Sequence, residues 1–338
     1  MNKIGYILLL TAGLIMGACN DDTLSGPTPT ERSQANIEQL RAELSDAPHG
    51  WKLLYFPTTD SLLFSNLNTS LGMDDQHGHY GYGGFYYLLK FDKQGNVTLK
   101  ADHSPSPAEE QGRYAVHQSS STQLSLTTFT SLHTLIGTAF KGTSHFLYAR
   151  KDFDGSLVFR TMNYMEPAKE YIVMQRLDSD EAWNDNIKQA YDNRSFFESM
   201  KNPQIRIHTG AMVHFQSDMN MKAQEKHRAE ITSHRYYLFT FAKELAADPD
   251  AYPRTVVGLG SGYTGTEAGL SFHAGIRLNA NHVFHDFERV EDKFICELVQ
   301  VYDPHTLRPY LMAKHLAPKG QYKETGYIAE IFDMPTKR

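Results

Sequence analysis

The feature that most restricts the fold of this chain is a series of short β-rich runs separated by tight turns. The turns at 92–96 and 152–155 each contain a glycine and join runs rich in β-branched and aromatic residues. Turns this short connect antiparallel neighbours, because a parallel pair needs a crossover of about a dozen residues or more. The sequence therefore predicts a mainly β protein of antiparallel sheets and hairpins with a few helices. The predicted strands are 51–56, 85–91, 97–100, 145–151, 156–161, 170–177, 204–215, 233–241, 255–259, 269–278, 283–290 and 294–302.

Two helical segments interrupt this β pattern. The first has Ser33 as a candidate N-cap and repeats apolar residues at helical spacing as far as Leu44. The second has Asp178 as a candidate N-cap, with Glu181 as its capping-box partner, and runs to about Met200. We interpret its apolar stripe as core packing rather than a cofactor site; the stripe consists of Trp183, Ile187, Ala190 and Phe197.

These elements divide the chain into a first β-rich module at 33–177, a connecting helix at 178–202 and a second β-rich module at 203–338. A weak internal similarity suggests that the modules are related. Residues 86–91 resemble 236–241, and residues 122–126 resemble 268–272, in the same order in both halves. Chance recurrence of short β motifs is the alternative explanation.

The N-terminus predicts the location of the protein. Lys3 precedes an apolar stretch at 4–16, which as a helix would reach roughly 20 Å, less than the hydrocarbon core of about 30 Å. The small residues Gly17 and Ala18 then precede Cys19. This order favours a signal peptide at 1–18 and lipid attachment to Cys19, the first residue of the mature chain. An ordinary secretory peptide with an incidental cysteine is the alternative.

The segment after Cys19 indicates on which side of the membrane the protein lies. Asp21 and Asp22 resemble the acidic surface-export signal of Bacteroidetes lipoproteins, and residues 19–32 have the Pro, Thr and Ser composition of a flexible tether. We therefore expect an outer-membrane lipoprotein exposed at the cell surface, whose membrane partner is the bilayer that holds the Cys19 lipid. A polar tether without an export role, which would leave a periplasmic orientation open, is the alternative.

Composition excludes some function classes. The formal net charge of −6 lacks the basic footprint of a nucleic-acid-binding protein, so no nucleic-acid partner is predicted. The chain has two cysteines. If Cys19 carries lipid, Cys296 has no partner within the chain, and we expect it to be a buried, inert thiol.

The sequence motifs that are typical of enzymes are either absent or stand in a sequence context that does not suit them. Residues 260–265 match a dinucleotide-binding glycine pattern, but the sequence that follows has two glycines and no helical stripe. We therefore predict a glycine-rich loop between strands at 260–265. Ser261 lacks the flanking glycines of a lipase-type nucleophile, and no zinc-protease motif occurs. No catalytic residue and no cofactor is predicted.

The longest turn-rich connection, between Pro57 and Gly84, holds the candidate binding residues. His77 and His79 are weak candidates for a metal site, with Asp74 or Asp75 as a further ligand, although we expect no bound metal. Tyr80 and Tyr82 lie among glycines and are the candidate ligand contacts, because tyrosines offer a flat apolar face with a hydroxyl group. A loop without a partner is the alternative.

Several segments together resemble a known group of proteins. They are Cys19 with its acidic neighbours, the helix end at 44–50, the strand at 51–57, the segment 83–91, the strand at 124–128 with His133, and the segment 267–272. In these features the chain resembles the Bacteroidetes lipoproteins of the uncharacterised domain-of-unknown-function family 4302. The resemblance implies an accessory surface lipoprotein with a binding or scaffold role and carries no catalytic residues.

We therefore expect a non-enzymatic surface protein that binds a ligand, a glycan or a surface protein. A secreted glycan or peptide hydrolase with dispersed acidic residues is the alternative. A hydrolase would show a deep cleft that holds two close carboxylates or a nucleophile beside a histidine.

Overall fold

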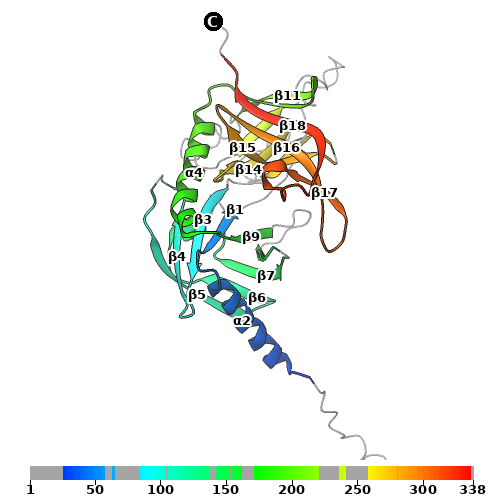
Figure 1. Cartoon of the computed structure of the whole chain (residues 1–338). Coiled ribbons are helices and arrows are strands. Elements are labelled where there is room, and N and C mark those ends of the chain that lie inside the picture. Colours follow the sequence, from blue (N-terminus) through cyan, green and yellow to red (C-terminus); the bar gives the residue numbers. More distant parts are fainter. Residues whose placement is uncertain are drawn as a thin grey trace, which may run out of the picture.

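The computed structural model contains two β-modules, each preceded by a helix (Figure 1). It describes residues 26–57, 63–64, 84–103, 106–136, 142–152, 154–161, 171–220, 236–240, 258–279 and 281–335. Within these residues all the strand pairs are antiparallel and helices are few, which confirms the predicted fold class. None of the described helices is both long and apolar enough to span a bilayer.

The first module is a closed barrel in which each strand pairs with its neighbour along the chain. The last strand returns to pair with the first, with Trp51 opposite Arg176. Its elements are α2 (Pro29–Ser45), β1 (Trp51–Tyr55), β3 (Phe85–Phe91), β4 (Asn96–Ala101), β5 (Glu110–Gln118), β6 (Thr122–Leu126), the 3-10 helix η1 (Ser131–Leu135), β7 (His145–Lys151), β8 (Leu157–Thr161) and β9 (Tyr171–Arg176).

Helix α2 supplies side chains to the core of this barrel. Leu40 and Leu44 are fully buried within the same apolar cluster as the inward-facing residues of the strands. The indole Nε1 of Trp51 donates a hydrogen bond of 2.9 Å to the backbone oxygen of Leu44 near the end of the helix. This bond pairs a carbonyl that the helix end would otherwise leave without a partner.

The start of α2 corrects two predictions, the Ser33 cap and a tether that continues to residue 32. The helix begins at Pro29, and Thr28 is its N-cap in a capping box with Glu31. The fixed φ of proline suits the first turn of a helix, and the Thr28–Glu31 pair satisfies backbone N–H groups there. These local signals are stronger than the single hydroxyl of Ser33.

The second module curls in the same way. β12 pairs with both β11 and β13, and β18 pairs with both β16 and β10, so its strands also form a closed ring. Its elements are α4 (Asp180–Ser199), β10 (Pro203–Thr209), β11 (Met212–Asn220), β12 (Tyr236–Thr240), β13 (Gly258–Gly265), β14 (Gly269–Arg277), β15 (Val283–Val290), β16 (Lys293–Tyr302) and β18 (Lys323–Asp333). Outside the ring, β2 (Leu63–Phe64) pairs with β13, and β17 (Pro309–Ala313) pairs with β16. The 3-10 helix η3 (Lys314–Leu316) follows β17 and lies beside β16.

The shared strand order is consistent with two β-modules, but the internal sequence similarity follows it only in part. Residues 122–126 and 268–272 fall on the fifth described strand of each ring. Residues 86–91 lie on the second strand of the first ring, whereas 236–241 begin on the third strand of the second. One of the two similar segment pairs therefore occupies equivalent strands.

Several predicted boundaries in and around the second module are wrong. The run at 204–215 is two strands joined by a turn at Gly210, whose φ of 54° favours glycine. The predicted glycine-rich loop at 260–265 belongs to strand β13. Helix α4 has Ser179, not Asp178, as its N-cap. The prediction also missed β2, β5, β17 and β18.

Helix α4 joins the two modules (Figure 1). Its N-terminal half packs on the outer face of the first barrel, where Trp183 and Ile187 share a buried cluster with Tyr86 and Leu88. Its C-terminal half places Phe197 in the core of the second module. Burial of Trp183, Ile187, Ala190 and Phe197 confirms that the stripe is core packing.

Glycine in β13 allows this helix to approach the sheet closely. A Cβ added to Gly265 would overlap the backbone oxygen of Ala190 in α4. The backbones of β13 and α4 cannot move apart as easily as a flexible side chain can change its rotamer. The glycines of 260–265 therefore include a packing position rather than a phosphate site.

We expect Gly265→Ala to lower the free energy of unfolding by about 3 kcal/mol, because the added methyl group must push α4 from the sheet. Gly112→Ala in β5 is the matched control: its nearest neighbour would be a methyl carbon of Thr130 at 3.2 Å, which can move. Urea unfolding of both variants measures the difference. An equal loss of unfolding free energy in the two variants would contradict the close contact between α4 and β13.

Candidate ligand pocket beside the module junction

An open pocket of about 390 Å³ lies where α4 meets two turns of the second module. The helix contributes one wall, and the β13–β14 and β15–β16 turns contribute the other two. The lining residues, of which all but Ala268 have polar side chains, are Gln189, Asp192, Asn193, Glu267, Ala268, Arg289 and Glu291. This mixture can both donate and accept hydrogen bonds.

The floor of the pocket is held by hydrogen bonds between elements. Asn193 is buried, and its Nδ2 donates to the backbone oxygen of Thr266 at 2.9 Å. The backbone N–H of Arg289 donates to the oxygen of Ala268 at 2.8 Å. The β13–β14 turn is thus fixed from both α4 and β15, which gives the pocket a rigid base.

Glu267 connects this floor to the first module. Lys52 Nζ in β1 donates to one carboxylate oxygen at 2.6 Å, and Tyr86 Oη in β3 donates to the other at 3.0 Å. Burial by itself raises the pKa of Glu267, but the charge and hydrogen bond of Lys52 outweigh it, and the net pKa is lowered. Burial and Glu267 together raise the pKa of Tyr86 well above its usual value. Glu267 therefore stays ionised while Tyr86 keeps its donor proton.

Arg289 is positioned at the rim. Its guanidinium carbon lies 3.8 Å from the centroid of the Phe196 ring, a distance at which a cation is attracted to the ring face. Nη1 donates to Asn193 Oδ1 at 3.4 Å, and Nε donates to the backbone oxygen of Glu291 at 3.3 Å. These contacts orient the guanidinium and leave Nη2 without a hydrogen-bond partner among the described residues.

Glu291 occupies an unusual backbone conformation at the same rim. It lies in the two-residue connection between Val290 and Lys293, which pair across the hairpin, and its φ is 56°. This left-handed conformation costs a non-glycine residue about 1–2 kcal/mol. A two-residue hairpin connection requires a positive φ at its first residue, so the tight turn itself accounts for this conformation.

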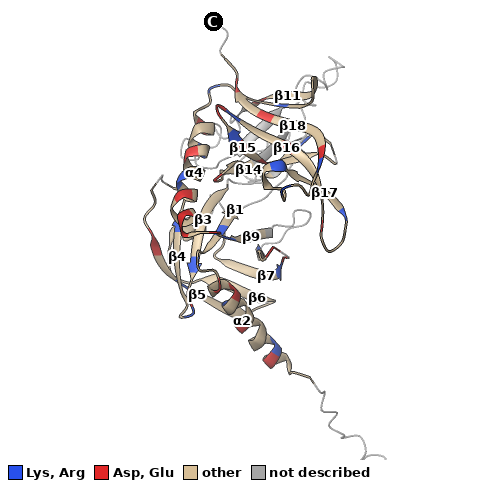
Figure 2. Ribbon diagram, viewed as in Figure 1, with Lys and Arg blue, Asp and Glu red and all other residues tan. Residues whose placement is uncertain are grey.

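Three side chains at the rim keep free hydrogen-bonding capacity. In the described part of the chain, the Gln189 amide and the carboxylates of Asp192 and Glu291 have no hydrogen-bond partner. With Arg289 they present acceptors and donors to one space. The acidic groups exceed the single guanidinium, and acidic residues also extend along α4 (Figure 2). Such an excess of carboxylates repels anions.

The pocket was not predicted from the sequence. The predicted site residues Cys19, His77, His79, Tyr80 and Tyr82 lie outside the described residues, as do Asp74 and Asp75. No group of three or more potential metal ligands occurs among the described residues. Two pocket residues, Glu267 and Ala268, lie inside the segment 267–272 that the sequence analysis singled out, but nothing in the sequence marked them as a site.

Two other residues singled out from the sequence have structural roles. Cys296 is buried, as predicted, and burial raises the pKa of its thiol well above the usual value. His133 lies in η1, where its Nδ1 accepts a hydrogen bond of 3.1 Å from the backbone N–H of Thr130. Neither lines the pocket.

Fold and pocket together define a class: a two-module antiparallel β protein with a shared helix and an open polar pocket. The model of a family described as a domain of unknown function (DUF4302) matches residues 21–291, and the chain belongs to this family. This match confirms the part of the resemblance that concerns the domain-of-unknown-function family 4302. A comparison with curated protein sequences found no match.

The contact between Lys52 and Glu267 can be measured by a double-mutant cycle. Lys52→Met should lower the free energy of unfolding by about 2 kcal/mol, because it leaves a partly buried carboxylate without its counter-charge. Adding Glu267→Gln should recover about 1 kcal/mol of that loss. The control is Lys314→Met at the more exposed pair with Glu297, where we expect less than about 1 kcal/mol. If the two substitutions changed the free energy of unfolding in a strictly additive way, Lys52 and Glu267 would not be coupled.

Proposed function

We propose that this protein is a lipid-anchored cell-surface protein that binds a glycan in the junction pocket and does not cleave it. The observation that carries the proposal is the rim, where an amide, two carboxylates and an oriented guanidinium share one open space. Sugar hydroxyls both donate and accept hydrogen bonds, so they can use every group of that set. The pocket volume of about 390 Å³ lies in the range of small-ligand sites.

The protonation state of Glu267 does not suit the general acid of a glycosidase. A general acid in a glycosidase needs a carboxyl group whose pKa is raised, so that it holds a proton at working pH. Lys52 and Tyr86 instead hold the pKa of Glu267 below its usual value. Glu267 therefore suits a role as a fixed acceptor and a structural link.

Glycan binding can be tested on the mature domain with an oligosaccharide array, followed by titration and a turnover assay on every ligand found. Asp192→Ala should weaken binding at least about tenfold, as loss of an important polar contact does. Asp185→Ala is the matched control, because Asp185 is an exposed acid on the same helix that does not line the pocket. Equal affinities of the two variants would place the glycan elsewhere.

The same titration tests the loop predicted from the sequence. Tyr80→Ala and Tyr82→Ala should each weaken binding if that loop contributes contacts. Normal binding by both variants would restrict the site to the pocket. Product release from any bound glycan would favour the hydrolase alternative.

The proposed location rests on the N-terminus. Cys19→Ser should release the protein from membranes and abolish acyl labelling, since the lipid supplies the anchor. Asp21→Asn combined with Asp22→Asn should keep the protein in the membrane but protect it from protease added to intact cells. Membrane retention of the Cys19 variant would refute the lipid anchor.

A further inference from the structure

Opposite charges share the junction pocket without forming ion pairs. Arg289 brings a guanidinium to the pocket, and Asp192 and Glu291 bring carboxylates. In the described part of the chain, Arg289 forms an ion pair with neither carboxylate, and no other cation pairs with them. The third carboxylate of the lining, that of Glu267, is already neutralised by Lys52. The pocket therefore offers one positive group and two negative groups to a ligand.

The contacts of Arg289 explain why these charges stay separate. The guanidinium carbon lies 3.8 Å from the centroid of the Phe196 ring, and Nη1 donates to Asn193 Oδ1 at 3.4 Å. Nε donates to the backbone oxygen of Glu291, not to its carboxylate. Because these three contacts hold the guanidinium, its charge does not collapse onto a neighbouring carboxylate.

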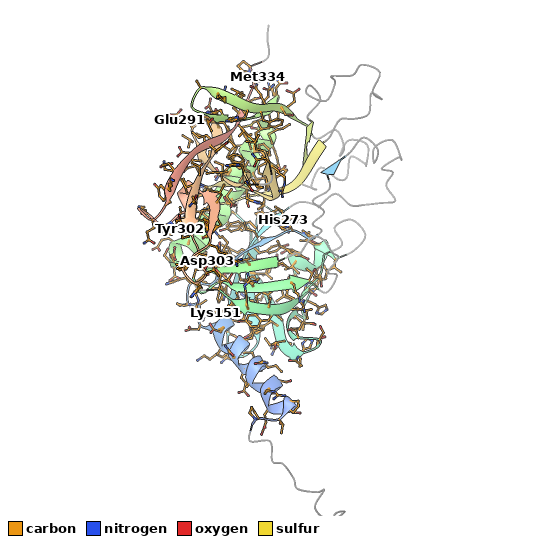
Figure 3. The ribbon with its side chains drawn as sticks, turned by 90° about the vertical axis from the view of Figure 1, so that its right-hand side faces the viewer. Lys151, His273, Glu291, Tyr302, Asp303 and Met334 are labelled. Carbon is orange, nitrogen blue, oxygen red and sulfur yellow. The ribbon has the colours of Figure 1, made fainter. Side chains whose placement is uncertain are left out.

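The positive and negative groups come from different elements around the pocket. Arg289 belongs to β15, whereas Asp192 belongs to α4 on the opposite wall. Glu291 lies in the β15–β16 turn, at the outer edge of the second module (Figure 3). A ligand between these walls can therefore meet the guanidinium on one side and a carboxylate on the other.

A ligand with a single kind of charge cannot satisfy this lining. The carboxylates repel an anion, and the guanidinium repels a cation. A ligand that carries both an ammonium group and a carboxylate can satisfy both, since its carboxylate accepts from Arg289 and its ammonium donates to Asp192 or Glu291. Such charge-assisted hydrogen bonds are stronger than those of neutral hydroxyl groups.

We infer that the ligand of the junction pocket is zwitterionic: a glycan whose neighbouring sugars carry an ammonium group and a carboxylate. Arg289 binds the carboxylate, and Asp192 and Glu291 bind the ammonium group. This inference rests on the proposed glycan binding and names the class of glycan. A short peptide carries the same pair of groups at its two ends and is the other source of this chemistry.

The experiment titrates the full chain with matched tetrasaccharides that differ in charge. The zwitterionic probe alternates glucuronic acid with glucosamine, and its N-acetylated form is purely acidic. A tetramer of glucosamine is purely cationic, and a tetramer of N-acetylglucosamine is neutral. The zwitterionic probe should bind at least about tenfold more tightly than the neutral probe, because it adds two charge-assisted contacts. The acidic probe should bind most weakly.

Two variants assign each charge of the ligand to its partner. Asp192→Asn should reduce the preference for the zwitterionic probe over its N-acetylated form by about fivefold, because only a carboxylate attracts the ammonium group. Arg289→Met should reduce the preference for the zwitterionic probe over the glucosamine tetramer by a similar factor. Asp185→Asn and Lys188→Met are the matched controls, because both residues are exposed on α4 and do not line the pocket. They should keep both preferences.

The remaining outcomes separate this inference from the proposed function. Equal affinities for the zwitterionic and neutral probes would overturn the inference and leave glycan binding intact. Tightest binding of the glucosamine tetramer would overturn the role of Arg289 and with it the inference. Binding of glycylglycine alone, weakened by Asp192→Asn and Arg289→Met, would support the paired charges and refute the glycan. Absence of binding by the tetrasaccharides and by glycylglycine would overturn both.

Discussion

The ion pair between Lys52 and Glu267 is the contact on which the arrangement of this molecule depends. A partly buried carboxylate is costly unless a cation and hydrogen-bond donors accompany it, and here both come from the first module while the carboxylate belongs to the second. The pair therefore has a low free energy only when the β13–β14 turn sits against β1 and β3. Because Glu267 also lines the pocket, the shape of the pocket depends on the junction of the modules.

Backbone packing reinforces that junction. The N–H of Gly84, just before β3, donates to the oxygen of Tyr263 in β13 at 2.9 Å, and a side chain at Gly84 would collide with Phe56. On the other side, Gly265 lets α4 contact β13 directly. Arg194 of the same helix donates to the backbone oxygen of Asp102 at 3.1 Å. Helix α4 thus packs on the outer face of the first barrel and contributes to the core of the second module, and the modules meet through backbone as well as side chains. The pocket beside α4 is polar, rich in acidic groups and open, which suits a ligand with many hydroxyl groups.

The sequence by itself determined the β character, the hairpin at 92–96 and the buried stripe of α4, because each arises from contacts between residues close in the chain. Asp92, for example, accepts hydrogen bonds from the N–H groups of Gln94 and Asn96 within its own turn. Boundaries failed where one local signal outweighed another, as when Thr28 rather than Ser33 began the first helix. Only the tertiary structure decided the pocket and the role of Gly265. Lys52 and Glu267 lie 215 positions apart, and Arg289 finds Phe196 on another element. Contacts at such separation leave no periodic pattern in the sequence, since they exist only after two sheets have closed and one helix has joined them.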